Sequence, residues 1–168
     1  VQDQVRAPEY TDLDRGLDQF ARFGRHDLPD VAAVRRALQE RAAHLARSGL
    51  GTRNREGVFR YHDGAREQLA HNERAALGRD EASRSGRSFL DPSRAQDQSW
   101  KLEREVQLAS GRVGVFGRGG ELTIAPIPHH HGLEIGDRVR LELTATAMKG
   151  DYAIKAVKDL SKGLDLGR

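Results

Sequence analysis

The sequence contains no cysteine, five prolines and few aromatic residues: one tryptophan, three tyrosines and five phenylalanines. The lack of cysteine excludes a disulfide framework, a thiolate zinc site and thiol catalysis. No stretch approaches the roughly 20 consecutive apolar residues that cross a bilayer. The first ten residues, VQDQVRAPEY, have neither the basic start nor the apolar core of a signal peptide. We therefore expect no membrane partner and a cytoplasmic location.

The composition limits the size of the hydrophobic core. Hydrophobic residues make up 37% of the 168 residues and charged residues 32%, and the mean hydropathy is -0.70. Two modest cores are therefore expected rather than one large core. The chain begins at Val1 rather than at methionine, so we also expect it to be part of a longer protein.

Charge is distributed unevenly along the chain, although the net charge is only +3. Residues 1–30 contain seven acidic and four basic side chains, whereas residues 33–60 contain seven arginines and two glutamates. Such a basic segment indicates an anionic partner or a solvated surface.

Apolar spacing predicts helices in the first half of the chain. Thr11 is a suitable N-cap for a helix over about 12–23. A second helix, about 30–48, carries Leu38, Ala42 and Leu45 on one face and ends before Gly49. A third is expected over 64–78, ending at Gly78.

The segment between the second and third helices predicts a hairpin. Residues 50–53 and 58–61 flank a turn at 54–57, and Phe59 and Tyr61 fall on one strand face. A helix followed by a basic hairpin and another helix is typical of a winged-helix-like unit, which we place at residues 9–78.

Composition and hydrophobic periodicity change twice in the second half of the chain. Residues 79–99 are rich in Ser, Arg and Asp and predict a polar linker. Residues 100–158 show five segments of period-two alternation separated by glycine-containing turns, which predicts a small antiparallel β-barrel, OB-like or SH3-like. Residues 159–168 are expected to form a tail. The predicted class is α+β.

The arginines of the basic segment are the candidate nucleic-acid-binding residues. In a winged helix, the helix offers side chains to the major groove while the wing contacts phosphate, and the planar guanidinium suits both tasks. The alternative is a solvated helix face, and a GC-rich genome also favours arginine. The candidates are Arg35, Arg36, Arg41, Arg47, Arg53, Arg55 and Arg60.

Other motifs do not predict chemistry. The His129–His131 run lies between prolines and Glu134 and lacks a third ligand, so we predict a polar turn and no metal. No serine has a neighbouring base or a nucleophile elbow. The glycines at 117–120 lie between two strands and predict a turn rather than a phosphate loop. We therefore expect no cofactor and no enzymatic activity.

The barrel offers a second nucleic-acid hypothesis. Trp100, Phe116 and Tyr152 lie near several basic residues, and stacking platforms beside basic grooves bind single strands. The alternative is that these three rings simply form the barrel core.

Four segments together resemble a known family. They are Tyr10–Leu17, Arg41 to Leu50, Gly57–Arg60, and Leu69 to Arg74. Over about residues 9–78 they are similar to the C-terminal region of relaxases, the mobilisation nucleases of conjugative plasmids. In that region a T-x-x-D-x-x-L helix precedes a helix ending in L-x-R-x-G-L, a short wing and a further helix.

The resemblance implies a non-catalytic accessory role in bacterial conjugation. The catalytic parts of the family, a nucleophilic tyrosine and a histidine cluster, belong to an N-terminal domain that this chain lacks. The first hypothesis is an accessory domain that binds DNA during plasmid transfer. The second is a translocation signal recognised by a type IV secretion coupling protein.

Overall fold

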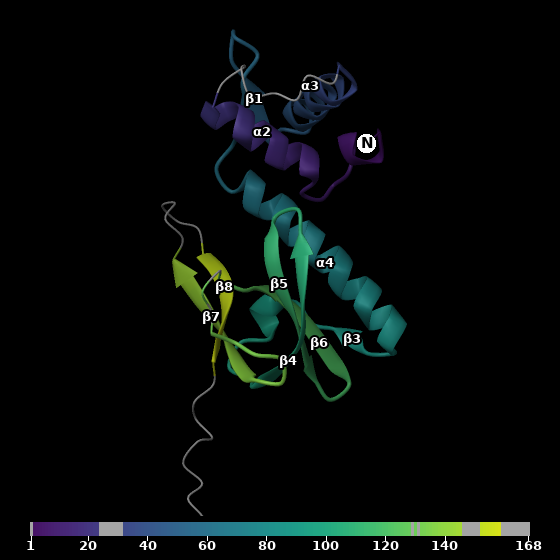
Figure 1. The fold of residues 1–168 in the computed structure, drawn as a ribbon, viewed down its shortest axis with the longest axis vertical. Helices are drawn as coiled ribbons and strands as arrows, with labels where there is room; N and C mark the ends of the chain where they lie inside the picture. Colours follow the sequence, from purple (N-terminus) through teal and green to yellow (C-terminus); the bar gives the residue numbers. More distant parts are fainter. Residues whose placement is uncertain (1, 24–31, 129, 131, 146–151, 159–168) are drawn as a thin grey trace, which may run out of the picture. The chain divides into compact units, whose positions relative to one another are not determined.

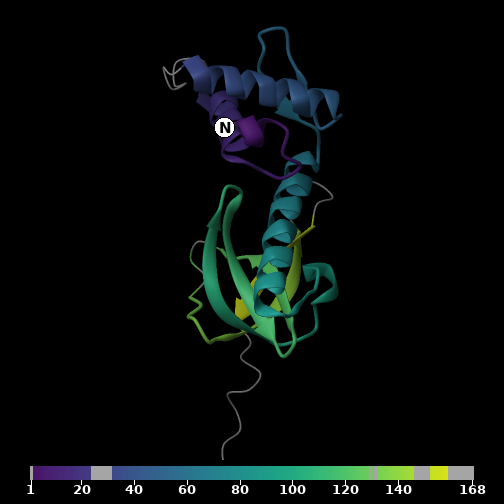
Figure 2. The same ribbon diagram turned by 90° about the vertical axis from the view of Figure 1, so that its right-hand side faces the viewer.

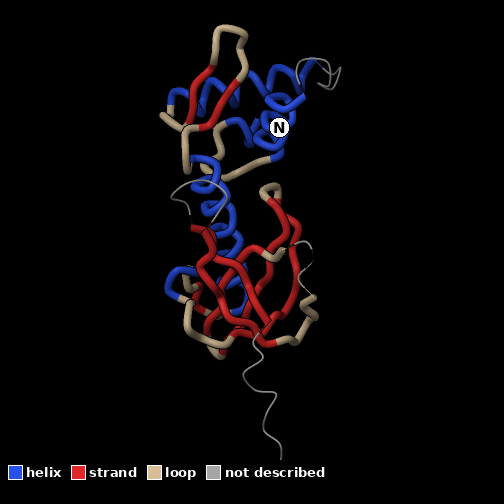
Figure 3. Tube along the Cα trace, turned by 90° about the vertical axis from the view of Figure 1, so that its left-hand side faces the viewer, coloured by secondary structure: helices blue, strands red, loops and turns tan. Residues whose placement is uncertain are grey.

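The chain forms helices, a hairpin and a larger mixed sheet (Figure 1). A computed structural model describes residues 2–23, 32–128, 130, 132–145 and 152–158. The chain divides into two compact units, unit 1 (Val1–Glu73) and unit 2 (Arg74–Arg168). Figure 3 shows that most strands belong to the second of these units. The predicted α+β class is confirmed.

Unit 1 contains helices, a two-stranded hairpin and the start of a long helix. Its elements are α1 (Gln2–Val5), α2 (Asp12–Phe23), α3 (Ala32–Arg47), β1 (Gly51–Arg53), β2 (Phe59–Tyr61) and the first part of α4 (Ala65–Ser85). Helices α2 and α3 and the hairpin are confirmed as predicted. Helix α3 packs against α1, α2 and β1. The buried side chains between them include Leu13, Leu17, Leu38, Ala42, Leu45, Phe59 and Leu69.

Two glycines of unit 1 fix local geometry. A Cβ at Gly16 in α2 would lie only 2.9 Å from Cδ2 of Leu38, so glycine permits the close approach of α2 to α3. Gly49 has a φ of 74° and ends α3. The Gly49 N–H donates to Ala46 O at 3.1 Å and the Leu50 N–H to Leu45 O at 2.9 Å. This is the left-handed cap that the sequence predicted.

Unit 2 contains one six-stranded sheet. Its strands are β3 (Ser88–Phe89), β4 (Trp100–Leu108), β5 (Gly111–Arg118), β6 (Glu121–Pro126), β7 (Arg138–Ala145) and β8 (Tyr152–Lys158). Their order is β3-β6-β5-β4-β7-β8. All neighbours are antiparallel except β3 and β6. The five strands predicted within residues 100–158 are therefore confirmed as β4 to β8.

The sheet is curved rather than flat (Figure 2). Strands β6 and β8 contact each other although they do not pair in the sheet. A register shift between Leu102 and Arg104 in β4 adds local bending. The choice between an OB-like and an SH3-like barrel stays a prediction.

Two hydrophobic clusters stabilise unit 2. The first surrounds Trp100, which is 1% exposed and donates its Nε1–H to Ala95 O at 2.8 Å. Its other members are Leu102, Phe116, Ala125, Ile127, Leu133, Val139 and Leu141. The second joins Leu77 and Ala82 of α4 to β5 and β6, through Val113, Val115, Leu122 and Ile124. One part of the sheet is thus covered by the second half of α4.

The predicted linker over residues 79–99 is wrong. Helix α4 continues through Gly78 to Ser85, and β3 and a 3-10 turn, Pro92–Arg94, follow it. Phe89 of β3 packs on Gly78, where an added Cβ would lie 2.3 Å from Cε2 of the ring. The glycine therefore does not end the helix but makes room for an aromatic ring. Residues 159–168, predicted as a tail, lie outside the described residues.

In the described ranges, no helix is long and apolar enough to cross a membrane.

Candidate nucleic-acid interface

The β1–β2 hairpin is the wing that the sequence predicted, and its loop projects beyond the helices of unit 1 (Figure 2). Three residue pairs form its ladder, Gly51 with Tyr61, Thr52 with Arg60 and Arg53 with Phe59. Phe59 is 3% exposed and meets the ring of Tyr61 edge to face, with the centroids 4.9 Å apart. One face of the wing is therefore anchored by aromatic packing.

The loop at the tip of the wing is held by a single asparagine. The Asn54 side-chain oxygen accepts from the N–H of Glu56 at 3.0 Å and from the N–H of Val58 at 2.9 Å. The backbone N–H of Asn54 donates to Val58 O at 3.0 Å, and Gly57 has a φ of 82°. These contacts give the loop a defined backbone.

The wing and the end of α3 present four exposed arginines, Arg47, Arg53, Arg55 and Arg60. None of these four has an ion pair or a side-chain hydrogen bond within the residues that the structure describes. The single acidic residue among positions 47–62 is Glu56. Partial burial, then the charges of Arg41 and Arg47, lower the pKa of His44 on α3. Residues 47–62 therefore carry more positive than negative charge.

The arginines in the first half of α3 differ from those of the wing. Arg36 is exposed and donates its Nε–H to Glu40 at 2.9 Å, one helical turn away. Arg35 is also exposed and has an interaction partner. Both remain on the surface, but Arg36 already has a carboxylate partner.

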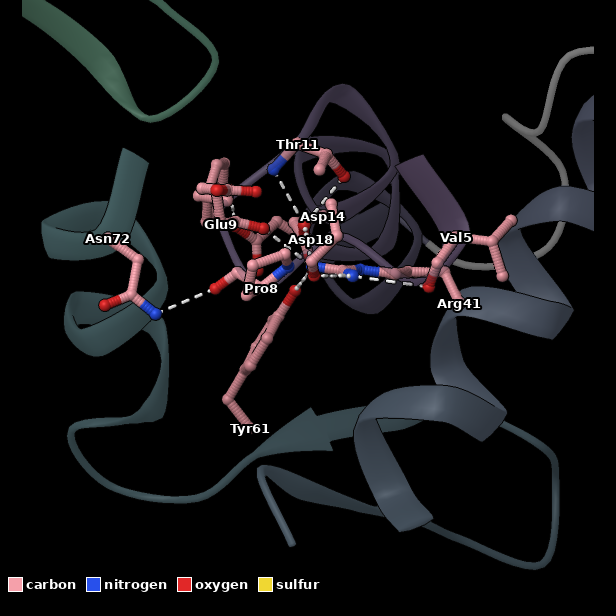
Figure 4. A network of polar contacts seen from close by, with 11 residues as sticks. Val5, Pro8, Glu9, Thr11, Asp14, Asp18, Arg41, Tyr61 and Asn72 are labelled. Carbon is pink, nitrogen blue, oxygen red and sulfur yellow. Dashed lines mark hydrogen bonds and ion pairs between the residues drawn. The ribbon is translucent and has the colours of Figure 1, made fainter. Parts of the chain in front are cut away.

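The hypothesis that Arg41 contacts phosphate is wrong. Its side chain is 0% exposed, because it projects from α3 into the interior of unit 1. All five guanidinium N–H groups are used (Figure 4). They donate to both carboxylate oxygens of Asp14 and to the carbonyls of Val5, Ala7 and Glu9. Arg41 is thus a buried cross-link between α3, α2 and the N-terminal segment.

Asp14 is the centre of this network and was missed as a site residue. Its Oδ2 accepts from the N–H and from the hydroxyl of Thr11, each at 2.8 Å. The contact to the Thr11 N–H is one half of a capping box, in which the third helical residue reaches back to the N-cap. Its Oδ1 accepts from the Tyr61 hydroxyl of β2 at 2.7 Å. One buried carboxylate therefore connects the wing to both helices.

A second polar group lies beside this network. The Tyr10 hydroxyl donates to Oδ2 of Asp18 at 2.7 Å. Arg66 of α4 pairs with the other oxygen of Asp18, and its guanidinium lies 5.6 Å from the centroid of the Tyr61 ring. Asn72 donates to Pro8 O at 2.8 Å (Figure 4). The start of α4 is therefore joined to α2 and to the N-terminal segment.

The buried tyrosine gives a testable pH dependence. Burial and the negative charge of Asp14 raise the pKa of Tyr61 above its ordinary value of 10.0. Because the folded state holds the neutral phenol, its contribution to stability is complete below pH 10.0 and declines at higher pH, where only the unfolded chain ionises. We expect Tyr61→Phe to remove up to about 1.4 kcal/mol per pH unit of this decline. Urea unfolding across the alkaline range measures it, and equal alkaline slopes in both proteins would contradict it.

The histidine run and the glycine turn are two other features that the sequence singled out. His129 and His131 lie outside the described residues, and among those described no cluster of His, Asp and Glu could hold a metal. The predicted glycine turn over 117–120 joins β5 to β6, and Gly119 has a φ of 58°. Glu103 pairs with Arg87 at 2.9 Å.

Two of the three rings of the proposed stacking platform in unit 2 are buried and cannot stack on bases. Trp100 and Phe116 are 1% and 0% exposed. The side chain of Tyr152 lies outside the described residues. Several nearby cations are also paired, Arg112 with Glu105 at 3.6 Å and Lys158 with Asp137 at 2.9 Å. The alternative, that these rings form the core, is confirmed for Trp100 and Phe116.

Comparison with known proteins gives one result. No curated protein and no solved structure matches the chain significantly. A family model described as a protein of unknown function, DUF3363, matches residues 1–153. This range includes the whole of unit 1, with the wing and the Asp14–Arg41 network, and most of unit 2. The chain therefore belongs to the DUF3363 family.

Proposed function

We propose that this chain is a non-catalytic accessory domain of a conjugative relaxase that binds nucleic acid through its wing. One observation carries the proposal, namely four exposed arginines at the end of α3 and on the hairpin that have no carboxylate partner among the residues that the structure describes. They are Arg47, Arg53, Arg55 and Arg60. The relaxase context rests on the resemblance of residues 9–78.

The pairing of other surface arginines supports this interpretation. Arg36 and Arg84 are exposed on helices and each pairs with a carboxylate four residues away. Such intrahelical pairs are typical of a solvated surface. In the described ranges the wing arginines have no such carboxylate, and they lie on an anchored hairpin, so an anionic partner would meet cations that are already positioned.

The test is the salt dependence of nucleic-acid binding in a charge-reduced variant. We expect the triple variant Arg53→Gln, Arg55→Gln, Arg60→Gln to bind more weakly. Because each phosphate contact releases counterions, the slope of log K against log salt should become smaller by about 0.9 for each arginine on duplex DNA. Fluorescence anisotropy at several salt concentrations measures both quantities.

A matched control separates the wing from net charge. Arg79, Arg94 and Arg138 are exposed arginines of unit 2 that also have no ion pair among the described residues. Changing these three to Gln removes the same charge and should leave the slope unchanged. Equal losses in the two triple variants would overturn the proposal. Absence of salt-dependent binding by the unaltered chain would also overturn it and would favour recognition by a secretion coupling protein.

A further inference from the structure

The wing carries its cations on both faces and at its tip. Residues directly opposite on paired strands share a face, and neighbours along a strand alternate between faces. Arg53 is opposite Phe59, whereas Arg60 follows Phe59 and is opposite Thr52. Arg53 and Arg60 therefore lie on opposite faces of the hairpin, and Arg55 lies in the loop between the strands. All three are exposed.

The backbone that carries these arginines is fixed. The stem is held by burial of Phe59 and by the Tyr61 hydroxyl, which donates to the buried Asp14 at 2.7 Å. The loop is held by Asn54, which accepts two backbone N–H groups. A two-stranded ribbon has a width that the major groove of B-form DNA admits.

Proteins that bind single strands need stacking surfaces as well as cations, because the splayed bases must be covered by aromatic rings. Among the aromatic residues whose burial the structure describes, none is exposed. Tyr10, Phe59, Trp100 and Phe116 are buried, and Tyr61 and Phe89 are half-buried. Tyr61 also has its hydroxyl bonded to Asp14.

We infer that the wing enters a groove of double-helical DNA, with Arg53 and Arg60 directed to the two phosphate backbones that flank the groove. This inference rests on the proposed function and adds its substrate class. A groove has a phosphate backbone on each side, whereas a single strand has only one. Cations on both faces of one ribbon therefore match a duplex, and a single strand would leave one face unused.

The experiment compares a duplex of about 20 base pairs with each of its separate strands at equal salt, using the full chain and fluorescence anisotropy. We expect the duplex to bind about tenfold more tightly, because neither strand alone supplies both backbones. Arg53→Gln and Arg60→Gln should each weaken duplex binding and each reduce the salt slope by about 0.9. Arg94→Gln is the matched control and should change neither quantity.

The outcomes separate this inference from the proposed function. If single strands bind as tightly as the duplex, and still depend on the wing arginines, the duplex inference is overturned while the proposed function stands. Loss of duplex binding from only one of the two wing variants also overturns it, because only one face would then contact phosphate. If no nucleic acid binds in a salt-dependent way, the proposed function itself is overturned. Circular dichroism of each variant verifies that the chain remains folded.

Discussion

Asp14→Asn should destabilise unit 1 by about 3–5 kcal/mol, because it leaves a buried charge without its partner. The carboxylate is 0% exposed and accepts hydrogen bonds from Thr11, Arg41 and Tyr61. An amide would leave the Arg41 guanidinium buried without an opposite charge. Its NH₂ group would also face donors. Urea unfolding followed by far-ultraviolet circular dichroism measures the change in unfolding free energy.

A surface pair provides the control for this prediction. Arg36→Gln also removes an ion pair of α3, but its partner Glu40 is exposed and water solvates the remaining charge. The expected cost is about 0.3–0.5 kcal/mol. A cost of less than about 1 kcal/mol for Asp14→Asn would contradict the view that this buried pair organises unit 1.

Trp100→Ala should destabilise unit 2 by about 3–5 kcal/mol. The indole is the largest buried side chain of the chain's described part and packs among Leu102, Phe116 and Val139. Truncation would leave a cavity and remove the donor to the Ala95 carbonyl, which is 2.8 Å from Nε1. The readout is thermal or urea unfolding by circular dichroism, because this is the only tryptophan and its removal abolishes the fluorescence signal.

A conservative variant distinguishes packing from the hydrogen bond. Trp100→Phe keeps an aromatic ring in the cluster and removes the Nε1–H donor, so we expect a cost of about 1–3 kcal/mol. If Trp100→Ala and Trp100→Phe destabilise the chain equally, the hydrogen bond rather than the packing dominates, and the prediction is wrong.

The Asp14 network and the wing arginines have different expected roles, the first in stability and the second in binding. Asp14 contacts the wing through the Tyr61 hydroxyl, so Tyr61→Phe removes this contact while the buried Phe59 still anchors the wing. Within the part of the chain that the structure describes, no ion pair or side-chain hydrogen bond joins the wing arginines to these residues. Stability and binding are therefore separable by mutation within the same unit.

The sequence contains a signal for the burial of Arg41. Leu38, Ala42 and Leu45 form the predicted apolar face of α3, and position 41 is three residues after 38 and four before 45. Helical periodicity alone therefore places Arg41 on the inward face. A buried arginine requires a buried acid, but several acids of α2 were available. Only the packing of α2 on α3 selected Asp14.

The end of α4 could not be predicted from local sequence. A glycine at position 78, followed by a polar stretch, has the pattern of a helix C-cap. The structure instead places the ring of Phe89 over this glycine and continues the helix to Ser85. The contact joins residues that are separated by a turn of the chain, so their interaction depends on the path of β3 beside β6.

The sequence by itself determined the elements whose signals are local. Hydrophobic spacing located α2 and α3, Gly49 marked the end of α3, and alternation located β4 to β8. Only the tertiary structure decided which arginines are surface cations and which one is a cross-link. It did so because burial, pairing and strand register depend on residues that are distant in the sequence. Arg41 and Arg53 are the same type of residue, and they differ only in the residues that surround them in the folded chain.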